Sequence, residues 1–411
     1  MSLELPVYLD YNATTPCDPR VVEAMAPYWT KHFGNAASRS HSFGWKAEEA
    51  VETARKQVAK IIGAQAKEII FTSGATESDN LAIKGIAEQL EAKGKHIITC
   101  LAEHKAVIDP CKYLEKKGYE ITWLKPDENG LVTPEQVEQA ITDETVLVSI
   151  MLANNETGTI NPITAIGKIC REKGVLFHTD ATQAIGKMPV NVDEMNIDLL
   201  SMSAHKVYGP KGVGALYVRS KNPNVKLVCQ MHGGGHQRRM RSGTLNVTGI
   251  VGFGKACEIA QQEMPEEIVR LRKLRDRLEQ GMLEKIPYMI RSGHPTKRLP
   301  NTTNLAFAYV EGEGMMMKCS KIAVSAGSAC TSESLSASHV LTAMGVSDAL
   351  SHSAMRFSIG RFTKEAEVDY TIEVFIKAVR ELRELSPLVD MAKASGEIET
   401  TNWSKPKSQQ N

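Results

Sequence analysis

The chain has 411 residues, of which 42% are hydrophobic and 24% charged, the composition of a soluble globular protein large enough for two or three domains. Lys and Arg (49) balance Asp and Glu (48), which leaves a formal net charge of +1. This balance excludes a global field that attracts nucleic acid or anionic membranes. The amino-terminal residues lack a signal-peptide pattern and no apolar run is long enough to span a bilayer, so a cytoplasmic protein is expected.

The cysteines are scattered along the chain without a CxxC pair. This spacing favours reduced thiols over a disulfide framework or a zinc site. Most are expected to be small buried hydrophobic residues. They stand at positions 17, 100, 111, 170, 229, 257, 319 and 330.

The first 62 residues predict a short strand and turn at 5–15, then a helix over 19–28. A polar, glycine-punctuated loop at 33–44 is either a flap beside a substrate or a solvated connector. An amphipathic helix is expected over 45–62.

The segment 68–78 (EIIFTSGATES) reads as a strand that runs into a helix start, with helical periodicity from Asp79. Backbone N–H groups and the helix dipole make such a start an anion site, and Thr76 adds a hydroxyl. Phosphate is the natural occupant. An ordinary helix cap formed by Thr76 or Ser78 explains the same pattern.

Strands then alternate with stretches of helical pattern, which predicts an α/β fold with a mainly parallel seven-stranded sheet. The last two strands are joined by too short a connection for a crossover helix, so the last is expected to be antiparallel. The expected strands are 68–72, 96–100, 121–125, 146–152, 175–180, 199–203 and 214–218.

Polar residues follow several of these strands, and the ends of parallel strands meet at one rim of the sheet. A carboxylate (Asp180) and an amine (Lys206) at that rim suit pyridoxal phosphate (PLP), whose aldehyde takes the amine and whose ring nitrogen takes the carboxylate. A simple Asp–Lys salt bridge is the alternative. His104 could stack on a planar cofactor or be a surface or capping residue, and an amide of Asn154 or Asn155 could hydrogen-bond the phenolic oxygen or simply hold a turn. The other polar residues at these strand ends are Gln183, Ser203 and His205.

The segment 231–244 (MHGGGHQRRMRSGT) is rich in glycine, then in basic residues, and lacks the ending of a P-loop. It contributes to a phosphate site, forms a basic patch for RNA or an acidic protein, or is a solvated loop.

From Gly249 the alternation stops, and a charged helical stretch runs to Ile286, expected to break or kink at Pro265. Two strands (303–310 and 354–360) and three helices follow, which together predict a smaller α+β domain. The helices are expected near 312–320, 336–344 and 364–385.

Cys330 lies in a run of small polar residues (SAGSACTSES, 325–334), unlike cysteines in apolar runs such as Cys100. A thiol in such a loop suits a nucleophile that moves between a site and an acceptor. An incidental cysteine is the alternative. Arg356, on the neighbouring strand, suits a substrate carboxylate or an inter-domain ion pair.

These stretches together resemble the NifS/IscS-type cysteine desulfurases, PLP enzymes of fold type I in the class-V aminotransferase family. The matching motifs cover nearly the whole chain, and the cysteine segment is similar to the long-loop group that serves iron–sulfur cluster assembly. The motifs are YLDYNATTP, FTSGATESDN, AEHKAV, ANNETG, HTDATQAIGK, SAHKVYGPKG, MHGGGHQRRMRSGT, SAGSACTS and MRFSIGRF.

The resemblance implies a role for each matching residue. Lys206 would be the Schiff-base lysine, Asp180 the partner of the ring nitrogen and His104 the residue stacked on the ring. Cys330 would carry a persulfide and, through it, would be a ligand for an iron–sulfur cluster. The residues near the ring substituents would be Asn155 and Gln183. The phosphate would be held by Ala75, Thr76, Ser203 and His205 with Thr244 of the partner subunit. The substrate would be bound by Asn35, Asn155 and Arg356.

The resemblance also implies a division into a PLP-binding domain (15–262), a small domain (1–14 and 263–394) and a polar tail (395–411). Two positions depart from the family pattern. Ala36 stands where many relatives have Pro, and Val389 replaces Trp in the segment (LSPLVD, 385–390) that relatives use for scaffold docking.

The activity implied is conversion of L-cysteine to L-alanine, with sulfur passed from Cys330 to an iron–sulfur scaffold protein or another acceptor, including tRNA-thiolation carriers. A homodimer is expected, without a membrane or direct nucleic-acid role. The alternatives are a selenocysteine lyase or another PLP aminotransferase-fold enzyme that does not need Cys330, and a non-catalytic RNA-associated protein that uses the basic segment.

Overall fold

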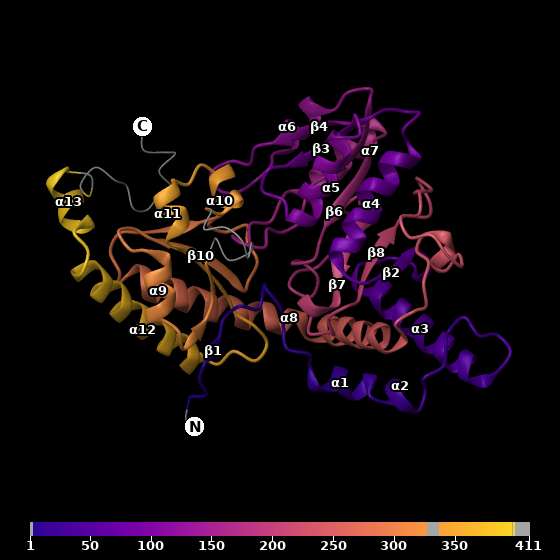
Figure 1. The fold of residues 1–411 in the computed structure, drawn as a ribbon, viewed down its shortest axis with the longest axis horizontal. Coiled ribbons are helices and arrows are strands. Elements are labelled where there is room, and N and C mark those ends of the chain that lie inside the picture. Colours follow the sequence, from indigo (N-terminus) through magenta and orange to yellow (C-terminus); the bar gives the residue numbers. More distant parts are fainter. Residues whose placement is uncertain (1–2, 327–336, 397, 399–411) are drawn as a thin grey trace.

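The computed structural model describes residues 3–326, 337–396 and 398, and it has two lobes joined by one long helix (Figure 1). That helix is α8 (Val247–Leu283). The larger lobe contains β2 (Ile69–Thr72), β3 (His96–Cys100), β4 (Glu120–Leu124), β5 (Thr145–Ser149), β6 (Leu176–Asp180), β7 (Leu199–Ser203) and β8 (Gly214–Val218). Its helices are α1 (Pro19–Met25), α2 (Pro27–Thr30), α3 (Ser42–Ile61), α4 (Ala75–Gln89), α5 (Lys105–Glu115), α6 (Pro134–Ala140) and α7 (Ile163–Lys173), with 3₁₀ turns η1 (Ala66–Glu68), η2 (Ala204–Lys206) and η3 (Gln237–Arg239).

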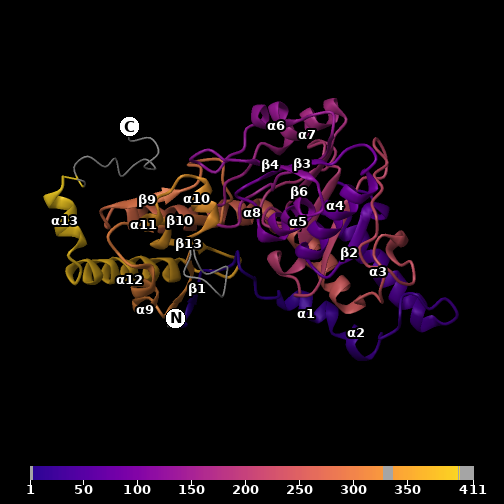
Figure 2. The same cartoon turned by 45° about the horizontal axis from the view of Figure 1, so that its top comes forward.

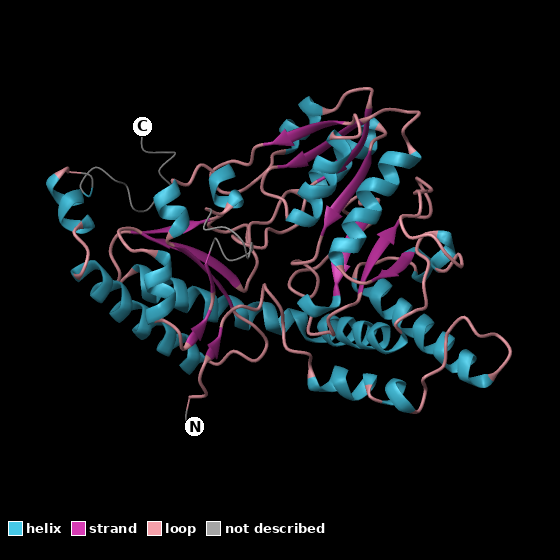
Figure 3. Cartoon of the chain, in the orientation of Figure 1, coloured by secondary structure: helices cyan, strands magenta, loops and turns pink. Residues whose placement is uncertain are grey.

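The smaller lobe lies at the opposite end of α8. Figure 3 shows its helices in cyan and its strands in magenta. Its strands are β1 (Val7–Tyr8), β9 (Met289–Ser292), β10 (Thr302–Phe307), β11 (Ile322–Ala323), β12 (Ser325–Ala326) and β13 (Ala354–Ser358). Its helices are α9 (Gly312–Lys318), α10 (His339–Ala343), α11 (Asp348–His352), α12 (Glu365–Glu384) and α13 (Leu388–Ala394). In both views α12 runs along this lobe, remote from the large sheet (Figure 2).

The large sheet has the strand order β2-β8-β7-β6-β5-β3-β4. β8 is antiparallel to both of its neighbours, and the other strands run in one direction. The prediction of a mainly parallel seven-stranded sheet in which the last strand, β8, is antiparallel is therefore confirmed. The carboxyl ends of β5, β6 and β7 therefore meet at one rim, where the polar residues that follow them come together.

Successive side chains of these strands enter two separate cores, because the strand period is two residues. In β2, Ile69 and Phe71 pack with α3, α7 and the first half of α8, whereas Ile70 packs with α4 and α5. Both faces of the sheet are thus covered by helices, as parallel sheets require. A fully buried side chain such as Phe177 or Phe253 contributes about 1.5–3 kcal/mol to this packing.

The sequence predicts a break or a kink at Pro265, and the break is wrong, because the long helix α8 continues through this residue. Pro265 is exposed, and water can therefore satisfy the carbonyl that loses its helical N–H partner. The amino-terminal half of α8 packs in the large core, and Leu271, Leu274 and Leu278 pack in the core of the smaller lobe.

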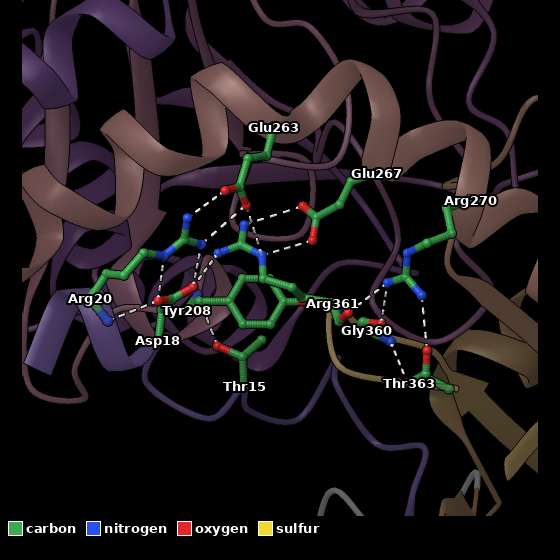
Figure 4. Close-up of polar contacts among 10 residues, drawn as sticks. All are labelled: Thr15, Asp18, Arg20, Tyr208, Glu263, Glu267, Arg270, Gly360, Arg361 and Thr363. Atoms are coloured by element: carbon green, nitrogen blue, oxygen red, sulfur yellow. Dashed lines mark hydrogen bonds and ion pairs between the residues drawn. The ribbon is translucent and has the colours of Figure 1, made fainter. Parts of the chain in front are cut away.

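An ion-pair cluster fixes the junction of the two lobes beside α8 (Figure 4). Arg361, just after β13, donates from Nη1 to Asp18 Oδ2 (2.8 Å) and from Nε to Glu267 Oε1 (2.8 Å). Its guanidinium lies 4.2 Å from the ring centroid of Tyr208. Hydrogen bonds from Arg20 and Arg361 hold the pKa of the Asp18 carboxyl well below its usual range. The cluster holds the end of β13, and with it Arg356, at a fixed place relative to the large sheet.

The amino-terminal segment crosses to the smaller lobe, where β1 pairs in parallel with β11 and Asp10 forms a bridge with Ser358. The smaller sheet has the order β12-β13-β10-β9 and is antiparallel. Sequence analysis predicted β10 and β13 but missed β9. Within the described residues, no helix has the length and apolar character that crossing a membrane requires.

Candidate active site

A cavity of about 770 Å³ opens at the carboxyl ends of the large-sheet strands and is closed on one side by the smaller lobe. Residues that sequence analysis derived from separate motifs line this one cavity. They are Ala75, Thr76, His104, Asn155, Asp180, Gln183, Ser203, His205, Lys206 and Arg356. The walls also include Asp10, Asn12, Thr182 and Ser325, which sequence analysis did not select.

One end of the cavity is the start of α4, directly after β2. The first N–H groups of a helix have no intrahelical partner, and the helix dipole adds positive potential there. Gly214 on β8 allows the close approach of this turn, because a Cβ at position 214 would lie 2.7 Å from Gly74 Cα. Thr76 and Ser203 add hydroxyl groups to the same wall. This end suits a phosphate group.

Lys206 follows β7 in the short turn η2, and its amine reaches the amino-terminal segment. Lys206 Nζ donates to Asn12 O (2.6 Å) and to Ala13 O (2.7 Å). Gln183 Nε2 donates to the same Asn12 carbonyl (2.9 Å). The segment after β1 therefore holds the amine at the cavity wall.

Asp180 ends β6 and accepts a hydrogen bond from Thr182 N (2.8 Å). Two further carboxyls, Asp79 on α4 and Glu103 after β3, are fully buried near it. Burial, followed by the charge of Asp180, raises the pKa of both carboxyls well above the usual range. This shift favours the neutral forms of Asp79 and Glu103, and Asp180 is the member of this group that lines the cavity, where it can pair with a cationic ring nitrogen.

His104 caps α5 by accepting from Ala106 N at Nδ1 (3.1 Å), which places its proton on Nε2 in the neutral ring. Desolvation by the surrounding walls lowers the pKa of His104 below its ordinary value, so the ring is neutral. A neutral flat ring at the cavity wall can stack on a planar cofactor. His205, whose pKa burial lowers to about 4, is likewise neutral.

Two buried oxygen atoms at the cavity have no hydrogen-bond partner among the described residues, namely Asn155 Oδ1 and Thr182 Oγ1. Buried polar atoms are normally satisfied, so they indicate a polar group that belongs in the cavity. With the anion site at α4, the amine of Lys206 and the carboxylate of Asp180, the residues present fit PLP.

Arg356 extends from β13 into the opposite wall. It donates to Asn155 O from Nη1 (3.0 Å), and from Nη2 to Asp10 Oδ1 (2.7 Å) and Ser325 Oγ (2.9 Å). Asp10 and Arg356 both belong to the small domain expected from the sequence, so this ion pair is not the inter-domain pair given as the alternative, and the hydrogen bond to Asn155 O is the contact of Arg356 with the large lobe.

Two predicted site residues that the structure describes do not line the cavity. Asn35 and Thr244 are exposed and lie outside it, and Cys330 lies outside the described residues. Arg241 of the basic segment pairs with Glu77 (2.7 Å), which places this arginine against the phosphate end of the site instead of on an RNA-binding surface.

Lys187 is a site neighbour that sequence analysis missed. It is buried, and its Nζ donates to Gln183 Oε1 (2.8 Å). Burial, with smaller contributions from Lys206 and Arg356, lowers the pKa of Lys187 to about 7. From the sequence alone, a lysine at this position is expected on the surface. Only the structure of the turn between Gln183 and Lys187 shows that its side chain points inward.

Substitution of Lys187 by Met is expected to stabilise the protein in a pH-dependent way. Between pH 7 and the ordinary lysine pKa of 10.5, the folded wild-type chain binds fewer protons than the unfolded chain, so its free energy of unfolding rises with pH across that window. Below pH 7 the wild type bears the full cost of burying the charged Lys187 amine. Lys187→Met should raise the free energy of unfolding by about 4–5 kcal/mol more at pH 6 than above pH 10.5. Urea unfolding at both pH values measures this, with exposed Lys168→Met as the control. A gain independent of pH would contradict the explanation.

Three consecutive residues in the segment after β8 have left-handed backbone conformations, Gln237 (φ 46°), Arg238 (φ 56°) and Arg239 (φ 65°). The Gln237 side chain holds this turn against the edge of the large sheet, because its Oε1 accepts from Phe71 N (3.0 Å) and Arg55 Nη1 (2.9 Å). Non-glycine residues adopt this conformation at a cost of about 1–2 kcal/mol.

Glycine at position 239 is expected to relieve part of that cost. Arg239→Gly should raise the free energy of unfolding by about 0.5–1 kcal/mol in urea. The matched control is Arg272→Gly on the exposed face of α8, which should lower it by about 1 kcal/mol. Equal destabilisation by both changes would show that the turn carries no strain.

Comparisons with known proteins agree with the geometry. The family model described as "Aminotransferase class-V" matches residues 7–371. A cysteine desulfurase IscS of Anaeromyxobacter dehalogenans is 57% identical over 404 residues, covering 98% of this chain and all of the relative. An Escherichia coli cysteine desulfurase IscS is 54% identical over 403 residues, covering 98% and 99%.

Solved structures give the same result. A NifS-like protein superposes with a TM-score of 0.85 at 39% identity, covering 92% of this chain and all of the other. The structure of SspA in complex with cysteine gives 0.75 at 40% identity, covering 86% and 98%. The chain belongs to the class-V aminotransferase family, among its IscS/NifS-type cysteine desulfurases.

Proposed function

We propose that this protein is a PLP-dependent cysteine desulfurase that converts L-cysteine to L-alanine and supplies the sulfur, as a persulfide on Cys330, for iron–sulfur cluster assembly. The observation that carries the proposal is a single cavity in which an amine, a carboxylate and an anion site face a guanidinium. Ser325, which begins β12 in the wall of that cavity, is followed closely in the chain by Cys330. The relatives named cysteine desulfurase IscS support the same assignment.

When bound, PLP supplies an electron sink for the carbanion formed at the substrate Cα. Lys206 would anchor the cofactor and, as a free amine, remove and return the Cα proton. Asp180 would keep the ring nitrogen protonated, while the raised pKa values of Asp79 and Glu103 favour their neutral forms. His104 would cover one face of the ring. Ala75, Thr76, Ser203 and His205 would hold the phosphate, with Asn155 and Gln183 near the ring substituents.

The sulfur step needs a thiolate. Cys330 would attack the substrate sulfur, so that an S–S bond forms as the C–S bond breaks. The electron pair of the C–S bond stays with carbon, which takes up a proton and leaves as L-alanine. His104 is the candidate base for the thiol proton, and because its Nδ1 accepts from Ala106 N, it must release this backbone N–H to take that proton.

We also propose a cytoplasmic homodimer in which Thr244 of the partner subunit completes the phosphate site. The exposure of Thr244, away from the cavity of its own chain, supports this arrangement. Asn35 would join Arg356 at the substrate carboxylate. The sulfur would pass to a scaffold protein or another acceptor, without direct nucleic-acid contact. Exposed Leu385, near the segment in which Val389 departs from the family, is a candidate contact for that acceptor.

The test is turnover of L-cysteine by the purified protein with a thiol reductant. Alanine and sulfide should appear in equal amounts, and only when the protein carries the yellow cofactor. A colourless protein that binds no PLP, or release of pyruvate in place of alanine, would overturn the proposal.

A further inference from the structure

The carboxylate-binding arginine of the cavity already holds a carboxylate of its own chain. The Arg356 side chain is 5% exposed, and Asp10 is its ion-pair partner among the described residues, with Nη2 and Oδ1 2.7 Å apart. An unpaired buried guanidinium is costly, so this pair stabilises Arg356 while no substrate is present. Asp10 is brought to it by the amino-terminal segment, through the bridge to Ser358.

The hydrogen bonds of Arg356 leave neither face of its guanidinium open. A carboxylate binds two-pronged either at Nη1 and Nη2 or at Nε and Nη2, so both forks use an Nη2 proton. Nη2 donates to Asp10 Oδ1 and to Ser325 Oγ, and the Ser325 hydroxyl in turn donates to Asp10 Oδ1 (2.9 Å), so both acceptors lie together at Nη2. Nε, by contrast, is buried and has no partner within the described part of the chain. A substrate carboxylate therefore gains a two-pronged contact only when Asp10 or Ser325 gives up Nη2.

Of the two side chains at Nη2, Asp10 is the one that an incoming carboxylate repels and displaces. It carries a negative charge at the place where a second negative charge must arrive, whereas Ser325 is neutral. Its side chain is 18% exposed and lines the cavity, so it can be hydrated when it leaves Arg356. Asn155 O, which holds Nη1, is a backbone atom and stays in place.

We propose that Asp10 is an internal competitor for the substrate-carboxylate position at Arg356 and thereby a specificity-determining residue. It occupies Nη2 in the free enzyme and yields to an α-carboxylate whose amino group is held at the same time at the cofactor. Ligands that offer a carboxylate alone lack the second anchor and bind weakly. The inference rests on the proposed function, because it takes Arg356 as the carboxylate site.

The test compares wild type and Asp10→Asn holoenzymes with propionate, which is the product skeleton without its amine. Asparagine keeps the size and the acceptor oxygen of Asp10 and removes its charge. The dissociation constant of propionate, from thermal-shift titration and from inhibition of cysteine turnover, should fall about tenfold. KM for L-cysteine should fall several-fold and change more than kcat. Unchanged or weaker propionate binding would overturn the proposal and leave Asp10 as a positioning residue for Arg356.

Three variants keep the result interpretable. Ser325→Ala removes the hydroxyl that accepts from Nη2 and donates to Asp10 Oδ1 but keeps the charge of Asp10, so it should raise propionate affinity far less than Asp10→Asn does. Arg356→Lys should weaken propionate binding with and without Asp10→Asn. If Asp10→Asn loses its fold or cofactor, Asp10→Ser makes the same measurement. If the wild-type protein forms no alanine from L-cysteine, the proposed function is wrong. The thermal-shift titration with propionate does not depend on that activity, so it still measures whether Asp10 competes with a carboxylate for Arg356.

Discussion

Replacing Lys206 by alanine is expected to abolish desulfuration, with a loss of at least about 10³-fold in kcat. The loss has two physical causes: the amine that anchors the cofactor is gone, and so is the base that moves the Cα proton. Purified Lys206→Ala should lose its colour on dialysis. After borohydride reduction of wild type, the cofactor mass should be found on the peptide that contains Lys206.

Lys206→Arg is the matched control for charge and structure. Arginine keeps a cation that can donate to Asn12 O and Ala13 O, the two carbonyls that Lys206 contacts in the structure. Its melting temperature should stay close to that of wild type while its activity is lost as in Lys206→Ala. Retention of a reducible cofactor on another lysine in either variant would contradict the assignment.

The residues at the rim of the large sheet could be predicted because short sequence patterns determine them. Strands such as β6 and β7 are apolar runs that end in polar residues, and parallel strands place those ends together. The antiparallel direction of β8 followed from a connection too short for a crossover. Asp180, Lys206 and His104 were therefore found from patterns of a few residues each.

The residues that sequence analysis missed depend on contacts between distant parts of the chain. Asp10 and Arg356 are separated by 346 positions, and no local pattern pairs them. Asp79 and Glu103 read as helix-start residues, and only the packed sheet makes them buried carboxyls beside Asp180. β9 is four residues long and half polar, too short a pattern to detect. A break or a kink is the local expectation at Pro265, and only the tertiary packing of α8 shows that the helix continues through this exposed proline.

Substitution of Cys330 by serine should stop persulfide formation and reduce alanine production from L-cysteine to at most about 1%. A serine hydroxyl is the same size but has far too high a pKa to be ionised at neutral pH. The described cysteines support this choice by contrast. Burial raises the thiol pKa of Cys17, Cys100, Cys111, Cys170, Cys257 and Cys319, which disfavours their thiolates.

The matched control is Cys229→Ser, because Cys229 is a partly exposed thiol, which donates to Met231 O (2.8 Å), away from the cavity. After incubation with L-cysteine, mass spectrometry should find one added sulfur on the Cys330 peptide in wild type and in Cys229→Ser. Cys330→Ser should keep its colour and its affinity for propionate, since Lys206 and Arg356 are intact. Undiminished alanine formation in Cys330→Ser would replace the persulfide mechanism with that of a lyase or aminotransferase, in which the cofactor and Lys206 suffice.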